Sequence, residues 1–466
     1  MFISRLFSII LNHPIVFISK LSPKRVFRFF KFLHSNGPIS TAQSIKLLVF
    51  DKKIPDYNLN IKLLNLYNDF INIKDYEPIV FQTTNNPLVS IIIPVFNHFN
   101  YTYNCLKSIH NNSGNKICYE IIIANDCSND FTKDISTVIK NISVVTTLTN
   151  QGFIKNCNNA AKTVKGKYIL LLNNDTQVQE NWLLPLVELI EKNDTIGAVG
   201  SKLIFENGKL QEAGGILWQD ASAWNYGYNN NPALPEYNYV KEVDYISGAS
   251  LMIRKSVWDK LGGFDENFTP AYCEDSDICF SIRKLGYKVM FQPSSVVVHF
   301  EGVTNGKDII LGQKQYQNLN TKKLYKKWKN VLIKNHYQNA ENVFFARDRS
   351  KNKKTILIID KSVPKFDKDK KSKTIFQYLN LFLLFGFNIK FIDDSFLKHH
   401  PYTSTLEQLG IEVLYGNYYF HNWKYWLKEN GFAIDFTFYF RSEIFNTYID
   451  EVKKNTVSKI FYLNMV

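Results

Sequence analysis

Short apolar runs that alternate with helical segments are the feature that most constrains the fold of this chain. From Pro87 onward, each run is rich in β-branched residues and is followed by a loop and then by apolar residues at helical spacing. Near-continuous apolar strands are typical of a parallel sheet that helices cover on both faces. The runs are VSIIIPV (89–95), EIIIA (120–124), SVVTTL (143–148) and YILLL (168–172), and the helical segments between them are 101–111, 131–140 and 156–165. The sequence therefore predicts an α/β fold with a mostly parallel sheet.

Polar residues follow each of the predicted strands. In open α/β sheets, ligands bind beyond the carboxyl ends of the strands. We therefore expect one cleft that is lined by residues 96–97, 125–130, 150–153 and 173–175. Asp175 is the best single metal candidate, because Mg²⁺ and Mn²⁺ prefer oxygen ligands and usually come with substrate phosphates. The alternative interpretation of Asp175 is a cap for a following helix.

Two further features suggest chemistry. Glu274, Asp275 and Asp277 place three carboxylates within four positions at the start of a predicted helix. Like charges so close repel one another, which favours a catalytic or metal-linked role, although a capped helix remains the alternative. His299 closes the apolar run VVVHF. A lone histidine there is more often a packing residue, and it becomes a ligand candidate because it ends a strand of the sheet that carries Asp175.

The net charge of +14 first suggests a nucleic-acid, membrane or phosphorylated partner. The charge is concentrated in two segments, since residues 1–50 carry +7 and residues 314–354 carry +10. The rest of the chain is therefore not basic, and no nucleic-acid partner is expected. The six cysteines form no CxxC pair and are interpreted as reduced structural thiols.

The amino-terminal segment is apolar but interrupted by Arg5, His13 and Pro14. It is predicted to be neither a membrane span nor a signal peptide. Its mixture of Phe, Leu and Ile with Arg and Lys suits a helix in the headgroup region of an anionic membrane. The alternative is a helix packed on the main domain. We therefore expect a cytoplasmic protein that is peripheral at the inner face of the bacterial cytoplasmic membrane.

Seven motifs occur in a fixed order between Pro87 and about Thr304. They are VSIIIPVFN, ANDCSND, NQGFIKNCNNA, LLLNNDT, ISGASLMIRKSVWDKLGGFDENF, YCEDSDICFSIRKLGYKV and VVVHFEG. Together they resemble the inverting family 2 glycosyltransferases of GT-A fold, in particular bacterial members that build O-antigen and capsule by extending lipid-linked sugars. The resemblance implies transfer of a hexosyl or deoxyhexosyl group from a nucleoside-diphosphate sugar to a saccharide acceptor, which would be lipid-linked.

The resemblance also implies a role for each matching residue. Asp275 would be the general base that takes the proton of the acceptor hydroxyl, and Glu274 would bind acceptor or orient the base. Asp175 and His299 would hold a divalent cation, Mg²⁺ or Mn²⁺, on the donor diphosphate. The residues implied for the nucleotide sugar are Pro94, Phe96, Asn97, Asn125, Asp126, Asn150, Gly152, Asn158, Asn173 and Asn174. The acceptor side is expected to include Gly248 and Ala249, with Trp218 and Trp224 from a long loop predicted over 208–239.

Two positions depart from the family pattern. Asn125 stands where the family usually has the Asp that contacts the base N3–H, and an amide oxygen still accepts such a bond. Asn173 stands at the first Asp of the DXD metal motif. Metal binding then depends on Asp175 and His299, so we expect weaker or more phosphate-dependent metal affinity.

The carboxyl-terminal segment opens a second strand-helix-strand pattern at Thr355. ILIIDKSVPKFDKDKKSKTIFQYLNLFLLFGFNIKFI resembles the first Rossmann-like half of family 4 glycosyltransferases of GT-B fold, and the alternative is an accessory α/β domain. The predicted division is a basic, partly helical segment (1–86), a GT-A domain (87–312), a Lys-rich linker (313–354) and an incomplete GT-B-like half (355–466).

Three other functions are alternatives for this sequence. A nucleotidyltransferase would need a Gly-rich basic loop after the first strand, and PVFNHFN has neither Gly nor Lys. A catalytically decayed sugar-nucleotide-binding or membrane scaffold is kept open by Asn125 and Asn173. A nucleic-acid binder is disfavoured because the Lys-rich segment comes without a recognisable nucleic-acid fold.

Overall fold

The computed structural model describes residues 54–65, 72–114, 116–301 and 315–463. Contacts divide the chain into two compact units, Met1–Pro55 and Asp56–Val466, and the second is described below. Of the predicted basic, partly helical segment (1–86), residues 1–53 and 66–71 lie outside the described residues, so its membrane binding stays a prediction. Within the described ranges, every helix is too short or too polar to cross a membrane.

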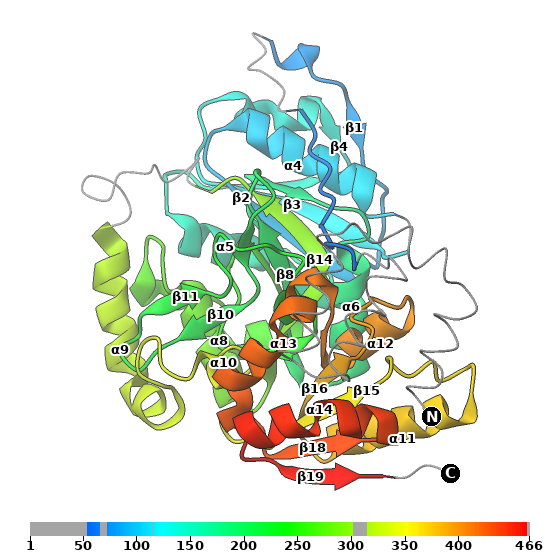
Figure 1. The fold of residues 1–466 in the computed structure, drawn as a ribbon. Helices are drawn as coiled ribbons and strands as arrows, with labels where there is room; N and C mark the ends of the chain where they lie inside the picture. Colours follow the sequence, from blue (N-terminus) through cyan, green and yellow to red (C-terminus); the bar gives the residue numbers. More distant parts are fainter. Residues whose placement is uncertain (1–53, 66–71, 115, 302–314, 464–466) are drawn as a thin grey trace, which may run out of the picture. The chain divides into compact units, whose positions relative to one another are not determined.

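A ten-stranded sheet forms the centre of the amino-terminal part of this unit (Figure 1). Its main path runs β12-β14-β8-β13-β6-β2-β3-β5, with β7 added on β14 and β9 on β8. The strands are β2 (Val89–Val95), β3 (Tyr119–Asn125), β5 (Ser143–Thr146), β6 (Tyr168–Leu172), β7 (Thr176–Val178), β8 (Ile196–Ile204), β9 (Leu210–Glu212), β12 (Lys241–Glu242), β13 (Ser250–Arg254) and β14 (Lys288–His299). Strands β5, β3, β2 and β6 are parallel neighbours, and β13 is antiparallel to both β6 and β8. The predicted α/β class is confirmed.

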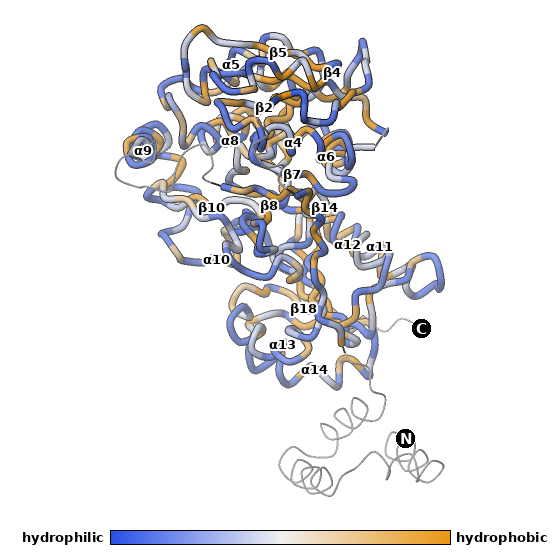
Figure 2. The backbone as a smooth tube through the Cα atoms, turned by 90° about the horizontal axis from the view of Figure 1, so that it is seen from above, coloured by the Kyte–Doolittle hydropathy of each residue, from blue (hydrophilic) through white to orange (hydrophobic). Residues whose placement is uncertain are grey.

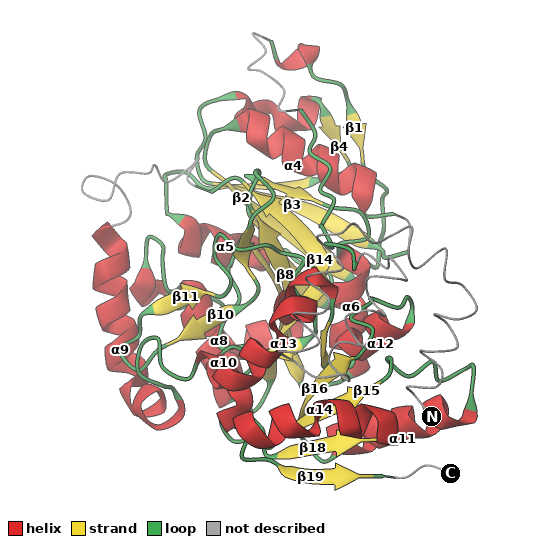
Figure 3. Ribbon diagram, viewed as in Figure 1, coloured by secondary structure: helices red, strands yellow, loops and turns green. Residues whose placement is uncertain are grey.

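Helices cover both faces of this sheet, which explains the unbroken apolar runs (Figure 3). Alternate residues of β2 enter opposite cores: Ile92 packs with α5 and α8, whereas Ile91 and Ile93 pack with α4 and α6. Residues of a strand point alternately to its two faces, so a strand that is buried on both faces needs apolar residues at every position. The helices of this part are α4 (Phe99–Asn112), α5 (Phe153–Ala161), α6 (Leu183–Lys192), α7 (Lys255–Leu261) and α8 (Glu274–Lys284).

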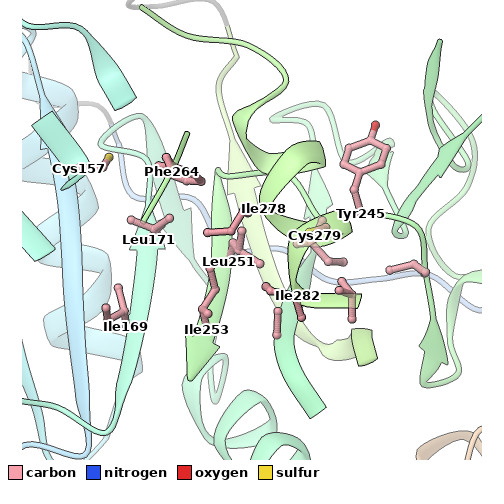
Figure 4. Close-up of a cluster of buried hydrophobic side chains, with 14 of the residues drawn as sticks. Cys157, Ile169, Leu171, Tyr245, Leu251, Ile253, Phe264, Ile278, Cys279 and Ile282 are labelled. Atoms are coloured by element: carbon pink, nitrogen blue, oxygen red, sulfur yellow. The ribbon is translucent and has the colours of Figure 1, made fainter. Parts of the chain in front are cut away.

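Figure 4 shows one of these two cores. Ile169 and Leu171 of β6 and Leu251 of β13 lie opposite Ile278 and Ile282 of α8. Figure 2 shows the same feature along the backbone, with hydrophobic stretches on the central strands β8 and β14. The core thus fixes α8, the helix that begins with Glu274 and Asp275, against the centre of the sheet.

Two predicted elements differ from the structure. The helix expected over 131–140 is a 3₁₀ turn, η2 (Phe131–Thr137), followed by the short strand β4 (Ile139–Lys140), which pairs with β1 (Ile79–Val80). The long loop expected over 208–239 contains β9, the hairpin β10 (Gly215–Leu217) and β11 (Ala223–Asn225), and the 3₁₀ turn η3 (Pro235–Tyr237). Much of it is buried, including Trp218, Tyr237 and Tyr239. The other 3₁₀ turns are η1 (Ile73–Asp75), η4 (Glu266–Phe268) and η5 (Gly431–Ala433).

The segment predicted as a Lys-rich linker contains a long helix, α9 (Gln315–Asn335), and the short α10 (Val343–Ala346). Leu324, Trp328 and Leu332 recur every four residues on one face of α9 and are buried in the core around α8. The lysines occupy the remaining faces, so α9 is an amphipathic helix although its composition is strongly basic. The described part of the linker therefore packs on the ten-stranded sheet's own core.

The carboxyl-terminal part contains a five-stranded, fully parallel sheet of order β17-β16-β15-β18-β19. Numbered along the chain this order is 3-2-1-4-5, the arrangement of doubly wound nucleotide-binding folds. The strands are β15 (Thr355–Asp360), β16 (Asn388–Asp393), β17 (Glu412–Leu414), β18 (Phe436–Tyr439) and β19 (Lys459–Tyr462), and the helices are α11 (Lys370–Leu384), α12 (Tyr402–Gln408), α13 (Gly416–Asn430) and α14 (Ser442–Asn455). The Rossmann-like pattern is thus present, while the likeness to GT-B enzymes stays a prediction.

A buried network of charges joins the two sheets. Lys390 of β16 bonds Asp348 at 3.0 Å and Glu412 at 2.8 Å, and Arg347 bonds Glu412 at 2.7 Å. Tyr239, which precedes β12, donates to Asp348 at 2.9 Å. All five side chains are almost completely buried, so each charge depends on its partners for stability.

Candidate active site

The first half of the site is a turn between β6 and β7. Asn173, Asn174 and Asp175 form this turn, and β7 pairs with the end of β14 so that Thr176 lies opposite His299. This pairing brings the Asp175 Oδ1 atom to 3.2 Å from the His299 Nε2 atom. The structure therefore brings together the two predicted metal ligands, which are 124 positions apart in the sequence. Asp175 precedes a strand, so it does not cap a helix.

The other ring nitrogen of His299 fixes how the ring is oriented. Its Nδ1 atom lies 3.2 Å from the Oε1 atom of Gln211, whose amide nitrogen donates to Glu301 at 3.3 Å. The amide oxygen therefore faces the ring, and Nδ1 carries a proton. Burial lowers the pKa of His299, and the negative charges of Asp175 and Glu301 outweigh burial and raise it above its ordinary value.

The residues present fit a divalent cation that is shared with a phosphate. Within the described ranges, no group of three or more His, Cys, Asp and Glu side chains is close enough to hold a metal alone. Asp175 and His299 lie together, and the side chain of Asn173 is 3.4 Å from the His299 ring. Mg²⁺ and Mn²⁺ are commonly held by one or two carboxylates plus substrate phosphates, so this small ligand set suits a cation that arrives with a diphosphate.

The second half of the site is the amino-terminal end of α8. Asp275 Oδ2 accepts a hydrogen bond from the Gly248 amide at 3.4 Å, and Oδ1 accepts one from the Ser276 amide at 2.6 Å. Burial raises the pKa of Asp275 and, together with the charge of Asp275, raises that of Glu274. Glu274 Oε2 is buried and has no hydrogen-bond partner among the described residues. Two carboxyl groups with raised pKa values are thus held side by side.

The third carboxylate of the cluster has a different task. Asp277 accepts bonds from Lys327 Nζ at 2.8 Å and from Trp328 Nε1 at 2.7 Å, both on α9. It therefore anchors α9 to α8, and only Glu274 and Asp275 remain for chemistry.

One turn links the two halves of the site. The Gly248 amide reaches Asp275, and the carbonyl of the next residue, Ala249, accepts from the Asn173 amide at 3.1 Å. Gly248 and Ala249, predicted for the acceptor side, therefore lie between the proposed base and the turn that carries Asp175.

The loops after β2, β3 and β5 are clamped to one another. The Asp126 carboxylate accepts three bonds at 2.8 Å, from the amides of Gln151 and Gly152 and the hydroxyl of Thr147. Asn125 Oδ1 accepts from the Ser128 amide at 3.0 Å, and Asn97 Oδ1 from the Asn129 amide at 2.9 Å. These polar groups build the rim of the sheet, and Phe96 stands beside them with 38% of its side chain exposed.

The remaining predicted nucleotide residues fall into two groups. Asn150 Oδ1 accepts from the Gly152 amide at 3.1 Å, and Gly152 has a φ of +79° with Pro270 so close that a Cβ would lie 2.8 Å from it. Pro94 is buried within β2. In contrast, Asn174 donates to Thr102 at 3.0 Å, and the Asn158 amide makes two 2.9 Å bonds with the backbone of Phe264. The side chains of Asn158 and Asn174 therefore make hydrogen bonds within the protein, and their predicted nucleotide contacts stay a prediction.

Comparisons with known proteins bear on this geometry. Residues 90–261 match the family model described as Glycosyl transferase family 2. The chain contains a glycosyl transferase family 2 domain. The match ends with α7, so α8 and β14, which carry Asp275 and His299, lie beyond the matched residues.

Curated relatives are similar to part of this chain. A glycosyltransferase of Haemophilus influenzae is 35% identical over 123 residues, which is 26% of this chain and 38% of that protein. The O-antigen biosynthesis protein RfbC of Myxococcus xanthus is 29% identical over 163 residues, 32% of this chain and 12% of that protein. A solved structure of GalNAc-T7 with UDP, GalNAc and Mn²⁺ is 20% identical, with a TM-score of 0.39, and the match covers 47% of this chain and 44% of that one. This chain thus spans less than two fifths of either curated relative.

The two tryptophans predicted for the acceptor side differ in their exposure. Trp218 is completely buried and packs edge-on against Trp224 with ring centroids 5.0 Å apart. A buried ring has no face left for a sugar, so Trp218 is a packing residue, contrary to the expectation. Trp224 is 39% exposed and keeps a free surface.

Sequence reasoning missed two residues of β9. Gln211 bonds His299, and Glu212, which is 0% exposed, accepts from the Ser247 amide at 3.2 Å. Burial, and next the charge of Asp275, raise the pKa of Glu212 to about 8. The available signal was the adjacent polar pair in KLQEAGGIL, since neighbouring polar residues in a short buried strand are unusual.

Proposed function

We propose that this chain transfers a sugar from a nucleoside-diphosphate donor to a saccharide acceptor with inversion at the anomeric carbon. The observation that carries the proposal is the turn at Gly248 and Ala249, which joins the Asp275 carboxylate to the Asp175–His299 pair. A direct displacement needs a base on one side of the reacting carbon and stabilisation of the leaving diphosphate on the other. The family 2 domain supports the transferase class.

Asp275 is the proposed general base. Its raised pKa makes it a better proton acceptor than an ordinary aspartate, and its two backbone hydrogen bonds fix its direction. Glu274 lies beside it, and its buried Oε2 atom, which has no hydrogen-bond partner among the described residues, suits a hydrogen bond that orients the base. Holding the acceptor hydroxyl in line with the donor supplies much of the remaining rate enhancement.

Asp175 and His299 would hold a divalent cation, Mg²⁺ or Mn²⁺, together with the donor diphosphate. When bound, such a cation offsets the negative charge that develops on the leaving diphosphate. Gln211 keeps the His299 ring turned toward Asp175, and Asn173 adds a neutral side chain to the same corner. Because only two of these side chains are strong ligands, we expect the cation to bind more tightly with nucleotide than alone.

The nucleotide sugar is proposed to lie over the rim that Phe96, Asn97, Asn125 and Asp126 build. The acceptor is proposed to approach from the side of Gly248 and Trp224. The similarity to an O-antigen biosynthesis protein supports a saccharide acceptor, which we propose to be lipid-linked at the inner face of the cytoplasmic membrane.

A donor panel tests this proposal. UDP-, GDP- and dTDP-linked hexoses and deoxyhexoses are incubated with the full chain, with and without Mn²⁺, and release of the nucleoside diphosphate is measured. We expect Mn²⁺-dependent release from one nucleotide class in the wild type and none in Asp275→Asn. Asp259→Asn is the matched control, because the Asp259 side chain is exposed on α7 and, among the described residues, accepts a hydrogen bond from Lys255. Nucleotide binding without turnover for every donor would favour the decayed scaffold instead.

A further inference from the structure

Glu212 is a buried carboxyl group that the proposed reaction does not use. It is 0% exposed on β9, and no cation lies within ion-pair distance of it among the described residues. Its Oε2 atom has no hydrogen-bond partner in the same ranges. Burial of a carboxyl group without a full set of partners costs stability, so its presence calls for a compensating role.

The side-chain hydrogen bond of Glu212 leads to the turn that joins the two halves of the site. Glu212 Oε1 accepts from the Ser247 amide, the next amide, Gly248, donates to Asp275, and the carbonyl of Ala249 accepts from Asn173. Three consecutive residues are therefore tied to three different parts of the site. Glu212 supplies the contact that holds the first of these three residues, Ser247.

The bond from Gly248 to Asp275 is sensitive to the position of this turn. At 3.4 Å it is already near the outer limit of a hydrogen bond, so a small shift of the turn would remove it. Asp275 would then depend on hydrogen bonds from α8 itself, including that from the Ser276 amide. The direction of the base relative to the turn at Asn173 therefore depends on what holds Ser247.

We propose that Glu212 is a positioning residue, which holds the Ser247–Ala249 turn so that Gly248 aligns Asp275 for proton transfer from the acceptor hydroxyl. The inference rests on the proposed function of Asp275. Glu212 does not touch substrate, because its side chain is fully enclosed.

The electrostatics agree with this role. With a pKa raised to about 8, Glu212 remains a neutral acid at pH 7, and its carbonyl oxygen accepts the Ser247 bond. A neutral group adds no second negative charge beside Asp275. An amide of the same shape can therefore replace it.

The test compares Glu212→Gln with Glu212→Met in the full chain. Glutamine keeps the acceptor oxygen, and we expect its kcat to stay within about twofold of wild type. Methionine keeps the volume and loses the acceptor, and we expect kcat to fall about tenfold or more, with the donor KM and the affinity for UDP plus Mn²⁺ unchanged. Glu206→Gln, at an exposed position in the turn before β9, is the control for changes on this segment.

A double-mutant cycle separates positioning from general structure. If Glu212 acts through Asp275, Glu212→Met causes no further loss of the residual rate in an Asp275→Asn background. Equal losses in both backgrounds, or a raised donor KM, would show a merely structural role and overturn the inference. A wild-type kcat in Glu212→Met would also overturn the inference. If the methionine variant fails to fold, a large loss of kcat in Glu212→Gln would overturn it instead. A wild type that turns over no donor refutes the proposed function itself, so the two failures are distinguishable.

Discussion

Replacement of Asp275 by asparagine separates catalysis from folding more sharply than any other change in this chain. A general base contributes about 10²–10⁴-fold to the rate, so we expect kcat to fall by that factor, which is about 3–5 kcal/mol of barrier. Asparagine keeps one acceptor oxygen, so one of the two bonds from Gly248 and Ser276 survives. The lost bond costs about 0.5–1.5 kcal/mol of unfolding free energy. Removal of a buried carboxylate that has no cation offsets this cost.

Stability and rate should depend on pH in opposite directions. Because burial raises the folded-state pKa of Asp275 and Glu274, the folded state binds protons more tightly than the unfolded chain. This pair therefore favours folding most at low pH, and that contribution is lost as pH rises through the raised values. The rate has the opposite trend, since the base must be ionised. In wild type we expect kcat/KM to rise with pH with a midpoint above the ordinary value for aspartate, and in Asp275→Asn we expect this rise to disappear.

The assay measures nucleoside-diphosphate release for kcat and urea unfolding for stability, with Asp259→Asn as control. A change in unfolding free energy of less than about 1.5 kcal/mol together with a rate loss of at least about 100-fold supports the base assignment. Wild-type turnover in Asp275→Asn would remove this residue from the mechanism. A loss of stability above about 3 kcal/mol would show instead that the carboxylate holds the fold.

Three further predictions follow from other parts of the chain. Asp175→Ala should abolish Mn²⁺-dependent binding of UDP in calorimetry, and unchanged affinity would remove Asp175 from the cation site. Lys390→Met should lower the unfolding free energy by about 3–5 kcal/mol, because Asp348 and Glu412 lose a buried cation. The control is Lys424→Met, which removes the more exposed ion pair with Glu451 and should cost about 0–1 kcal/mol. Equal losses of the two variants in urea unfolding would contradict this prediction. Deletion of residues 1–50, which carry +7, should release the protein from anionic liposomes in a sedimentation assay, and continued pelleting would place membrane binding elsewhere.

The sequence could predict the strands and the polar residues that follow their carboxyl ends, because both features depend on local sequence. The run VSIIIPV coincides with β2 and YILLL with β6, since burial on both faces demands apolar residues throughout. Asp175 and His299 could be placed at one end of the same sheet for a similar reason. The order of the strands, which sets their 3.2 Å contact, comes from pairing between β7 and β14.

Other roles depended on partners that the sequence does not place. Asp277 resembled Glu274 and Asp275 until α9 supplied Lys327 and Trp328, and α9 itself resembled a basic linker until Leu324 was found packed against the core. Composition describes a segment, whereas its burial depends on residues that are distant along the chain.

The sequence by itself determined the α/β class, the family 2 motifs and the places where chemistry would be found. Only the tertiary structure decided which polar side chains are free to act. Asn158 and Asn174 make hydrogen bonds within the protein and Trp218 is buried, whereas Glu212, 63 positions before Asp275 in the sequence, bonds the turn beside Asp275. The physical reason is that residue type sets what a group can bond, and long-range packing sets which partner it meets and whether water or substrate can reach it.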